Sequence, residues 1–203
     1  GCGMDFIPTN IRMEDIRGIQ TGNGTIIQAV IGSIMRAIPL NTERYKLPQK
    51  CEVLDRAKEE MEKYEENKEL VPLISDGYFQ VGSLGGGNHF IELQEDQEGC
   101  LCIMIHSGSR HLGKAVCDYF HKKARELNNM WYSEVKEEHH LSFLPVQSKE
   151  GQQYINWMNL SMDYAFENRA RMLDKTCEIV KEQIEKHTGH SVEFGEEINC
   201  HHN

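Results

Sequence analysis

The chain has 203 residues, of which 39% are hydrophobic and 27% charged, so it is long enough for a sizeable core and is not of the disordered class. Its formal net charge of −10 at pH 7 argues against a broadly basic nucleic-acid surface, although an acidic protein can still carry a local metal-lined groove. No apolar run approaches the roughly 18 residues that a membrane span needs, and no secretory signal opens the chain.

The number and spacing of the cysteines indicate the cellular compartment of the protein. The seven cysteines form an odd set without the spacing of a small disulfide scaffold: Cys2, Cys51, Cys100, Cys102, Cys117, Cys177 and Cys200. This usage favours reduced thiols and a cytoplasmic location, where a functional cysteine acts as a ligand or a nucleophile. Because the chain opens without a methionine and closes inside a cluster of histidines, we expect it to be part of a longer polypeptide.

The first part of the chain is predicted to be a loop followed by helices. Residues 1–6 are expected to form a glycine-flanked cysteine loop. Apolar side chains recur at helical spacing over residues 25–38, with Asn23 or Thr25 as the N-cap and a proline as the stop. A second, strongly charged helix is expected over about residues 52–66, and its charges indicate a solvated face.

From residue 78 the hydrophobic period changes to that of strands. Strands are predicted at residues 78–81, 89–93 and 101–105, the last of them apolar throughout and suited to burial on both faces. Long helices are predicted at about residues 114–138 and 152–186, with Gly189 ending the second, and a short strand at residues 192–198. The pattern predicts one α/β domain over residues 1–203, with mixed sheets flanked by long helices.

The stretch GSLGGGNHFIEL, residues 82–93, places a histidine shortly after three consecutive glycines. A backbone without Cβ atoms can turn tightly and bring its N–H groups close to a phosphate. In a regular strand beyond the turn, His89 would face one side and Phe90 and Glu92 the other, so that one side could hold a metal and the other a base. A tight hairpin turn with an incidental histidine explains this motif alone equally well.

A second histidine, His106, falls where the buried strand ends, and Ser-Gly-Ser-Arg follows it. The hydroxyls, the flexible backbone and the Arg110 guanidinium suit an oxyanion. The alternative is an ordinary turn in which Ser109 caps the next helix and Arg110 forms a surface ion pair. A serine-hydrolase interpretation fails, because Ser109 lacks the flanking G-x-S-x-G elbow.

Weaker candidates lie at the two ends of the chain, where Cys2 stands between two glycines and the run from His201 to Asn203 closes the sequence. A lone cysteine or histidine is usually structural. A thiolate and imidazoles from separate segments would nevertheless form a soft ligand set for zinc, manganese or iron. Cys100 and Cys102 are expected to pack in the core, and the remaining histidines to lie on exposed helices or turns.

Taken together, these motifs resemble the RtcB family of RNA ligases, which act in tRNA splicing and RNA repair, in its bacterial form. The resemblance rests on GCGM at residues 1–4, the two glycine-containing stretches, the helical segment MNLSMDYAFENR and the closing CHHN, in family order and with similar separations. It implies a single RtcB-type domain of α/β class, of which this chain would be the central part.

The resemblance also implies roles for individual residues. The metal ligands would be Cys2, His89, His106 and His202, and the GTP-binding residues Asn88, Phe90, Glu92 and Asn203. Arg110 would hold the RNA end. The family's aspartate ligand would precede residue 1 and its guanylated histidine would lie beyond residue 203, so we expect this chain alone not to self-guanylate.

The implied reaction joins an RNA 3′-phosphate or 2′,3′-cyclic phosphate to a 5′-hydroxyl, with GTP and two Mn²⁺ ions as cofactors. A histidine is first guanylated, the guanylate passes to the RNA 3′-phosphate, and the 5′-hydroxyl then displaces GMP. The residues leave two rivals open. One is a metal-dependent phosphoesterase that acts on RNA ends through a metal-bound hydroxide, and the other is a non-catalytic metal-binding domain with a closed four-coordinate site.

Overall fold

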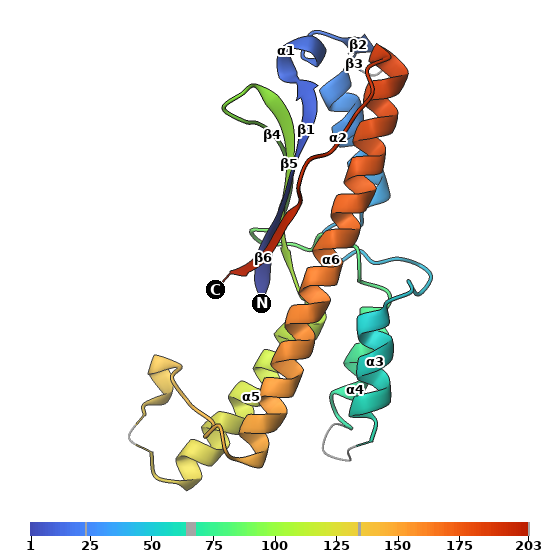
Figure 1. The fold of residues 1–203 in the computed structure, drawn as a ribbon. Helices are drawn as coiled ribbons and strands as arrows, with labels where there is room; N and C mark the ends of the chain where they lie inside the picture. Colours follow the sequence, from blue (N-terminus) through green and yellow to red (C-terminus); the bar gives the residue numbers. More distant parts are fainter. Residues whose placement is uncertain (23, 64–67, 134, 203) are drawn as a thin grey trace.

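The protein is described by a computed structural model over residues 1–22, 24–63, 68–133 and 135–202. A four-stranded sheet and six α-helices make up most of the regular structure of these residues. Figure 1 shows an elongated molecule in which one long helix, α6 (Lys149–Thr188), runs past the sheet at one end and past further helices at the other. The α/β class expected from the sequence is confirmed.

The sheet consists of β1 (Cys2–Arg12), β4 (Phe90–Glu95), β5 (Cys100–Gly108) and β6 (Ile198–His202). A separate small hairpin pairs β2 (Gln20–Thr21) with β3 (Gly24–Thr25). The remaining helices are α1 (Met13–Ile16), α2 (Ile26–Ala37), α3 (Glu52–Met61), α4 (Val71–Gly77) and α5 (Arg110–Met130), with a 3₁₀ turn at Glu137–His139. No helix of the described ranges is both long and apolar enough to cross a membrane.

The chain begins with a strand that the sequence pattern did not predict. Along β1, buried and less buried side chains alternate, as they do in a strand with one face on a core. Residues 1–6, expected as a loop, are therefore mostly strand. The alternation was hidden because the first two buried positions are Gly3 and Asp5, and neither carries an apolar side chain.

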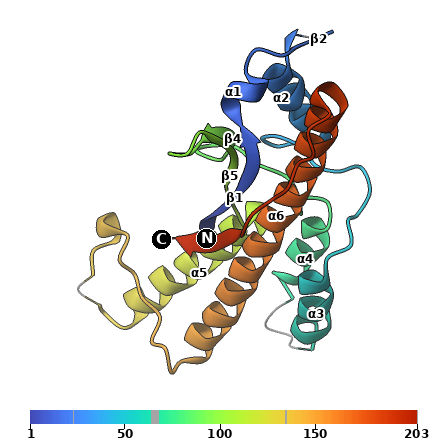
Figure 2. The ribbon, with the colours of Figure 1, turned by 45° about the horizontal axis from the view of Figure 1, so that its top comes forward.

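The strands lie in the order β4-β5-β1-β6, and every pairing is antiparallel. This corrects the expectation of a mixed sheet. For β4 and β5 the reason is local, because the turn between them is too short for the crossover that a parallel pair needs. On β1, which lies between β5 and β6, Cys2 is opposite Gly108 of β5 and His202 of β6. The two ends of the chain therefore meet at one end of the sheet, as Figures 1 and 2 show.

The long helix α6 contributes to two hydrophobic cores. Its C-terminal half packs with α2 against one face of the sheet, where Ile103 and Ile105 of β5 are fully buried. Its N-terminal half packs against α3, α4 and α5 around Trp157 and Tyr164. Burial of each such large apolar side chain stabilises the fold by about 1.5–3 kcal/mol. The helix thus connects the sheet to the helical part of the molecule.

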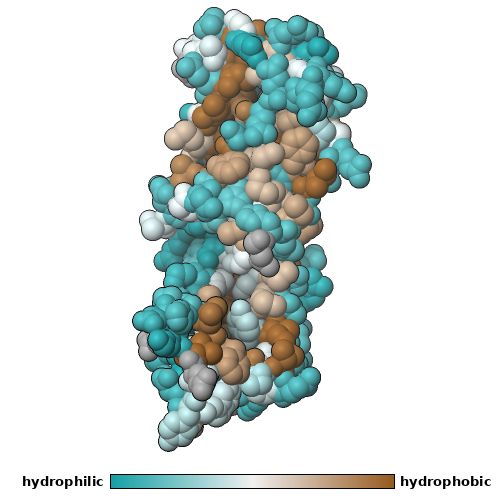
Figure 3. Space-filling model, turned by 90° about the vertical axis from the view of Figure 1, so that its left-hand side faces the viewer, coloured by the Kyte–Doolittle hydropathy of each residue, from teal (hydrophilic) through white to brown (hydrophobic). Residues whose placement is uncertain are grey.

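The opposite face of the sheet is not covered by helices in Figure 1. The register places Met4, Phe6 and Met104 on this open face together with His106 and Phe90. Figure 3 shows this side of the molecule, and brown apolar side chains gather over its upper half. The candidate residues therefore lie beside apolar surface.

Local signals predicted most of the helices correctly. Helix α2 begins after Thr25, whose hydroxyl accepts a hydrogen bond from Gln28 N while Gln28 Oε1 accepts one from Thr25 N, which is a capping box. Helix α6 ends at Gly189, whose φ of 73° is the left-handed conformation that glycine adopts readily. Helix α3 ends at Met61, and residues 64–66 of the predicted helix lie outside the described ranges. Helix α5 begins at Arg110 and ends at Met130, earlier than predicted at both ends.

Two predicted strands were wrong or misplaced. Residues 78–81 form the turn after α4, in which Gln80 N and Val81 N both donate to Gly77 O at 3.0 Å. Within residues 192–198, only Phe194 forms a bridge, to Thr9, and β6 begins at the last residue of that range. In both places short apolar runs resembled strands, although local hydrogen bonds and distant partners decided the structure.

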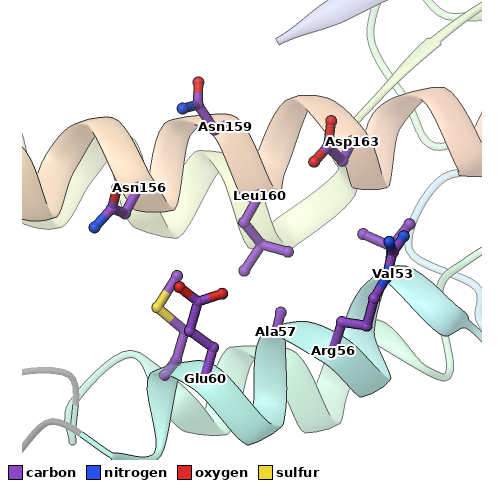
Figure 4. A pocket seen from close by; sticks show the side chains of 9 residues that line it. Val53, Arg56, Ala57, Glu60, Asn156, Asn159, Leu160 and Asp163 are labelled. Atoms are coloured by element: carbon purple, nitrogen blue, oxygen red, sulfur yellow. The ribbon is translucent and has the colours of Figure 1, made fainter.

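A cavity of about 310 Å³ lies between α3 and α6, as Figure 4 shows. Leu160 points across it toward α3, whereas Asn159 points away, and Arg56 and Glu60 line it from α3. None of the residues that line this cavity is a candidate metal ligand. The site suggested by the sequence motifs therefore lies elsewhere, at the end of the sheet.

Candidate metal centre

Three segments far apart in sequence bring Cys2, His89 and His106 together. Cys2 begins β1, His89 directly precedes β4, and His106 lies near the end of β5. One ligand atom from each residue, the cysteine sulfur or a ring nitrogen, lies within 4.8 Å of the other two. The antiparallel register produces this cluster, because it places the start of β1 beside the end of β5 and the start of β4 opposite His106.

His89 is oriented by a backbone carbonyl. Its Nδ1 lies 3.0 Å from Leu84 O, which can only accept, so Nδ1 carries the hydrogen and donates it. The other nitrogen, Nε2, then presents a lone pair at 3.7 Å from Cys2 Sγ. Burial lowers the pKa of His89, as do the nearby His106 and Arg110, so the ring stays neutral. A neutral imidazole whose second nitrogen donates to a carbonyl is the arrangement typical of metal-ligating histidines.

His106 is held in the same way from the other side. It is 4% exposed, and its Nδ1 lies 3.1 Å from Gly3 O, so a hydrogen on Nδ1 leaves Nε2 free for a metal. Burial lowers the pKa of His106, and the nearby His202 lowers it further. Met4 Sδ also lies 3.2 Å from the same nitrogen. The buried ring is therefore a neutral candidate ligand, and a backbone carbonyl of β1 sets its orientation.

His202 lies beside this group without joining the three-residue cluster. Its ring stacks on His106 with centroids 4.9 Å apart, and its Nε2 lies 3.3 Å from His106 Nδ1. Strand β6 brings it there, because His202 is opposite Cys2 in the register. The side chain is exposed at the open end of the sheet. Of the four predicted metal ligands, the structure thus gathers three tightly and places the fourth next to them.

The predicted separation of His89 from Phe90 is wrong. Both rings lie against His106, with centroid distances of 5.4 Å for His89 and 5.6 Å for Phe90. The reason is that β4 begins at Phe90, so the alternation of a strand does not extend back to His89. Glu92 lies on the same face of β4 as Phe90 and is exposed, and it accepts a hydrogen bond from Gln94 Nε2 at 2.8 Å.

The two predicted asparagines have different outcomes. Asn88 is exposed in the turn that directly precedes His89. Asn203 lies outside the described residues. The structure therefore places one of the two asparagines near the candidate metal ligands.

Arg110 does not form the surface ion pair that the alternative interpretation required. Its Nε donates to Ser83 Oγ at 2.9 Å and its Nη2 donates to Asn41 O at 2.9 Å. No carboxylate pairs with it among the residues the structure describes, and burial lowers its pKa. Ser109 makes no side-chain cap hydrogen bond either. The guanidinium is held beside the cluster with its charge unneutralised by a carboxylate.

Glycine is required where Arg110 crosses the glycine-rich loop. Gly85 has a φ of +88°, and a Cβ atom there would collide with the Arg110 guanidinium and lie 2.9 Å from His89 Nδ1. A Cβ at Gly87 would meet open space, although its φ is +77°. The three consecutive glycines therefore have different roles, and Gly85 is the one that permits the close approach of Arg110.

Residue-by-residue reasoning missed two buried polar residues of α6, Asn168 and Arg169, which are both 0% exposed. Arg169 Nε donates to Asn199 Oδ1 at 2.9 Å and Nη1 donates to Ser107 O at 3.3 Å. A Cβ at Gly3 would lie 2.5 Å from the Arg169 guanidinium carbon. The signal was present in the sequence, because an arginine on the apolar side of a helix needs a buried partner.

Asp5 shares this buried network. Its Oδ2 accepts a hydrogen bond from Asn199 Nδ2 at 2.9 Å, while Oδ1 has no hydrogen-bond partner. Burial and the nearby Glu197 raise the pKa of Asp5 to about 7, although Arg169 acts to lower it. The region between the sheet and α6 thus contains a carboxyl group that exchanges its proton near neutral pH.

The fold and the cluster define an α/β protein with a candidate transition-metal site of one cysteine sulfur and neutral imidazoles at the end of a sheet. A family model described as "tRNA-splicing ligase RtcB" matches residues 2–203. The chain belongs to the RtcB family.

Curated relatives are similar to parts of the chain. It is 33% identical over 118 residues to "RNA-splicing ligase RtcB" of Mycobacterium tuberculosis, covering 51% of this chain and 27% of that protein. It is 35% identical over 130 residues to "tRNA-splicing ligase RtcB" of Methanococcus maripaludis, covering 54% of this chain and 27% of that protein. It is 33% identical over 143 residues to "RNA-splicing ligase RtcB1" of Escherichia coli, covering 64% and 32%. Each match thus spans less than a third of the relative.

Proposed function

We propose that this chain carries most of the metal and nucleotide site of an RNA ligase of the RtcB type. The reaction would join an RNA 3′-phosphate or 2′,3′-cyclic phosphate to a 5′-hydroxyl with GTP and Mn²⁺. The observation that carries the proposal is the approach of Cys2, His89 and His106 to within 4.8 Å of one another from three separate segments. Membership of the RtcB family and the names of the relatives as RNA-splicing ligases support the same activity.

The residues present fit a divalent metal. Cys2 offers a sulfur, and His89 and His106 each offer a ring nitrogen whose partner nitrogen is engaged by a carbonyl. His202 is the fourth donor in the proposal, beside His106. Two Mn²⁺ ions bound there would supply the positive charge that neutralises a phosphate during transfer. This charge explains how a protein of net charge −10 can act on RNA.

The nucleotide in this proposal lies along the open face of the sheet. The Phe90 ring would stack on the guanine and the exposed Glu92 carboxylate would accept hydrogen bonds from its edge. The amides of Asn88 and Asn203 would hold the guanylate phosphate. All of the described members of this set lie at or near the end of the sheet that carries the metal ligands, so metal and nucleotide can share one phosphate.

Arg110 is the residue proposed to hold the RNA 3′-phosphate. Its guanidinium is fixed by Ser83 Oγ and Asn41 O and has no carboxylate partner among the described residues. A preorganised guanidinium binds a phosphate through charge-assisted hydrogen bonds without first leaving an ion pair. The guanylated histidine of the proposed reaction is expected beyond residue 203.

The test is Co²⁺ binding by the 203-residue chain, because a cysteine ligand gives Co²⁺ a thiolate charge-transfer absorption. The wild-type chain should show this band, and Cys2→Ser should abolish it while His89→Ala weakens binding. The matched control is His187→Ala, which changes an exposed histidine near the end of α6. A wild-type chain that shows no thiolate band, or a Cys2→Ser variant that retains it, would contradict the proposed site.

RNA ends distinguish the proposed ligase site from a phosphoesterase. A protein that covers the full length of the curated relatives should join the ends only when GTP is present. Release of inorganic phosphate from a 3′-phosphorylated RNA without GTP would instead support the phosphoesterase. The readout is gel separation of joined and unjoined RNA together with a phosphate assay.

A further inference from the structure

We propose that Asn168 is a positioning residue that fixes the orientation of His89 through a chain of hydrogen bonds. The inference deepens the proposed function and rests on the metal site proposed there. Asn168 touches none of the candidate ligands, and it lies on α6, far in sequence from both motifs that carry the histidines.

Asn168 joins the two loops that flank the site. Its Oδ1 accepts hydrogen bonds from Gly82 N at 2.7 Å and from Ser83 N at 3.1 Å. Its Nδ2 faces three acceptors, namely Ser83 O at 3.2 Å, Ser107 Oγ at 3.3 Å and Gly108 O at 3.1 Å. The side chain is 0% exposed, so water cannot replace these bonds. One amide therefore ties the start of the glycine-rich loop to the end of β5.

The series of hydrogen bonds continues from Ser107 to the ring of His89. Ser107 accepts from Asn168 Nδ2 and donates its hydroxyl hydrogen to Leu84 O at 2.9 Å. The same Leu84 carbonyl accepts from His89 Nδ1 at 3.0 Å. Ser107 and His89 thus share one carbonyl acceptor, and every member of the series is buried or half-buried. The position of the carbonyl, and with it the choice of ring nitrogen that faces Cys2, is thereby set from α6.

The glycine-rich loop needs such a restraint. Gly82, Gly85 and Gly87 all have positive φ, and between Val81 and Phe90 the structure contains only an isolated bridge at Gly85. A loop with this many glycines has many accessible conformations when it is not held. Asn168 bonds to consecutive N–H groups at the start of the loop and, through Ser107, to the carbonyl that orients the histidine. It thus reduces the freedom of the loop at the point where the metal ligand is attached.

Two variants separate the donor role of Asn168 from its bulk. Asn168→Asp keeps the shape and the acceptors for Gly82 N and Ser83 N but loses the N–H₂ group that reaches Ser107. Ser107→Ala removes the next link directly. The matched control is Thr176→Val on the same helix, because Thr176 is also 0% exposed but its hydroxyl donates only to Met172 O, at 2.7 Å, within the helix.

We expect Asn168→Asp and Ser107→Ala to weaken Co²⁺ binding by about tenfold, the lower end of the loss that follows removal of a ligand's direct partner, because both act on Leu84 O indirectly. Thr176→Val should stay close to wild type. The thermal unfolding midpoint of each variant is measured alongside, so that a loss of Co²⁺ affinity can be distinguished from a loss of stability. Co²⁺ affinity in both variants equal to that of the wild type, or lowered no more than in Thr176→Val, would overturn the inference.

A second readout does not depend on the metal. The ¹⁵N chemical shifts of the His89 ring in the metal-free chain should report the Nδ1–H tautomer in the wild type and a mixture of tautomers in both variants. A wild-type chain that bound no Co²⁺ would refute the proposed metal site, and the NMR result would then decide the role of Asn168. An unchanged single tautomer in both variants would refute that role.

Discussion

Replacement of Asp5 by asparagine should make the stability of the protein at neutral pH less dependent on pH. Asp5 is 0% exposed on β1, with one carboxyl oxygen bonded to Asn199 and the other without a hydrogen-bond partner. Its pKa is raised from 3.8 to about 7 by burial first and then by Glu197. The asparagine side chain would keep the shape and the acceptor for Asn199 but carry no charge to bury.

The sign of the effect follows from proton binding. Between about pH 4 and pH 7 the unfolded chain has lost this proton while the folded protein keeps it, so the stability contributed by Asp5 falls as pH rises. Below the unfolded pKa both states are protonated and the contribution is fully present. A raise of about three pKa units corresponds to roughly 4 kcal/mol at 1.36 kcal/mol per unit. Movement of the exposed Glu197 away from Asp5 would reduce this, so we expect about 2–4 kcal/mol.

The assay is urea unfolding of wild type and Asp5→Asn at pH 5, 6, 7 and 8, followed by circular dichroism. Histidines with lowered pKa, such as His89 and His106, titrate in both proteins and cancel in the difference between them. The variant should gain stability relative to the wild type as pH rises. Asp174→Asn, at an exposed position on α6, is the control and should show no such gain. Parallel profiles for wild type and Asp5→Asn would refute the reasoning.

Four further substitutions test the packing of the glycine-rich loop, a helix cap and a core hydrogen bond. Gly85→Ala should lower the free energy of unfolding in urea by about 2–5 kcal/mol, because the new side chain would have a positive φ and would collide with Arg110. Gly87→Ala has the positive φ without the collision and should lower it by only about 1–2 kcal/mol. Equal losses in the two variants would contradict the collision. Thr25→Ala should cost about 1 kcal/mol of unfolding free energy, and no loss would mean that the capping box is not formed. Tyr164→Phe should cost about 0.5–1.5 kcal/mol, because it removes the buried hydrogen bond from the Tyr164 hydroxyl to Gly77 O while Gln80 N and Val81 N still donate to that carbonyl, and an unchanged thermal midpoint would refute this.

Much of the candidate site could be predicted from the sequence, because its motifs are local and chemically specific. His89 and His106 stand beside glycine-containing segments that the sequence places next to strands, and the structure brings both to Cys2. His202 lies next to His106, although it is outside the three-residue cluster. The roles proposed for Phe90 and the other nucleotide residues stay predictions. The sequence could not reveal that Phe90 shares a side with His89, because this depends on the residue at which β4 begins.

The sequence by itself determined the helices with strong local signals and the apolar strand β5. A cap such as Thr25, a stop such as Gly189 and apolar periodicity act within a few residues, so they can be recognised without knowledge of the fold. Tertiary structure alone decided β1, the antiparallel order of the sheet and the partners of the buried Asn168 and Arg169. A strand that begins Cys-Gly and buries Gly3 and Asp5 shows no apolar alternation at its start, and it is stabilised by pairing with β5 and β6, which lie far along the chain. The buried amide and guanidinium likewise acquire their partners only when α6 packs on the end of the sheet, and that packing orders the loops around the candidate metal ligands.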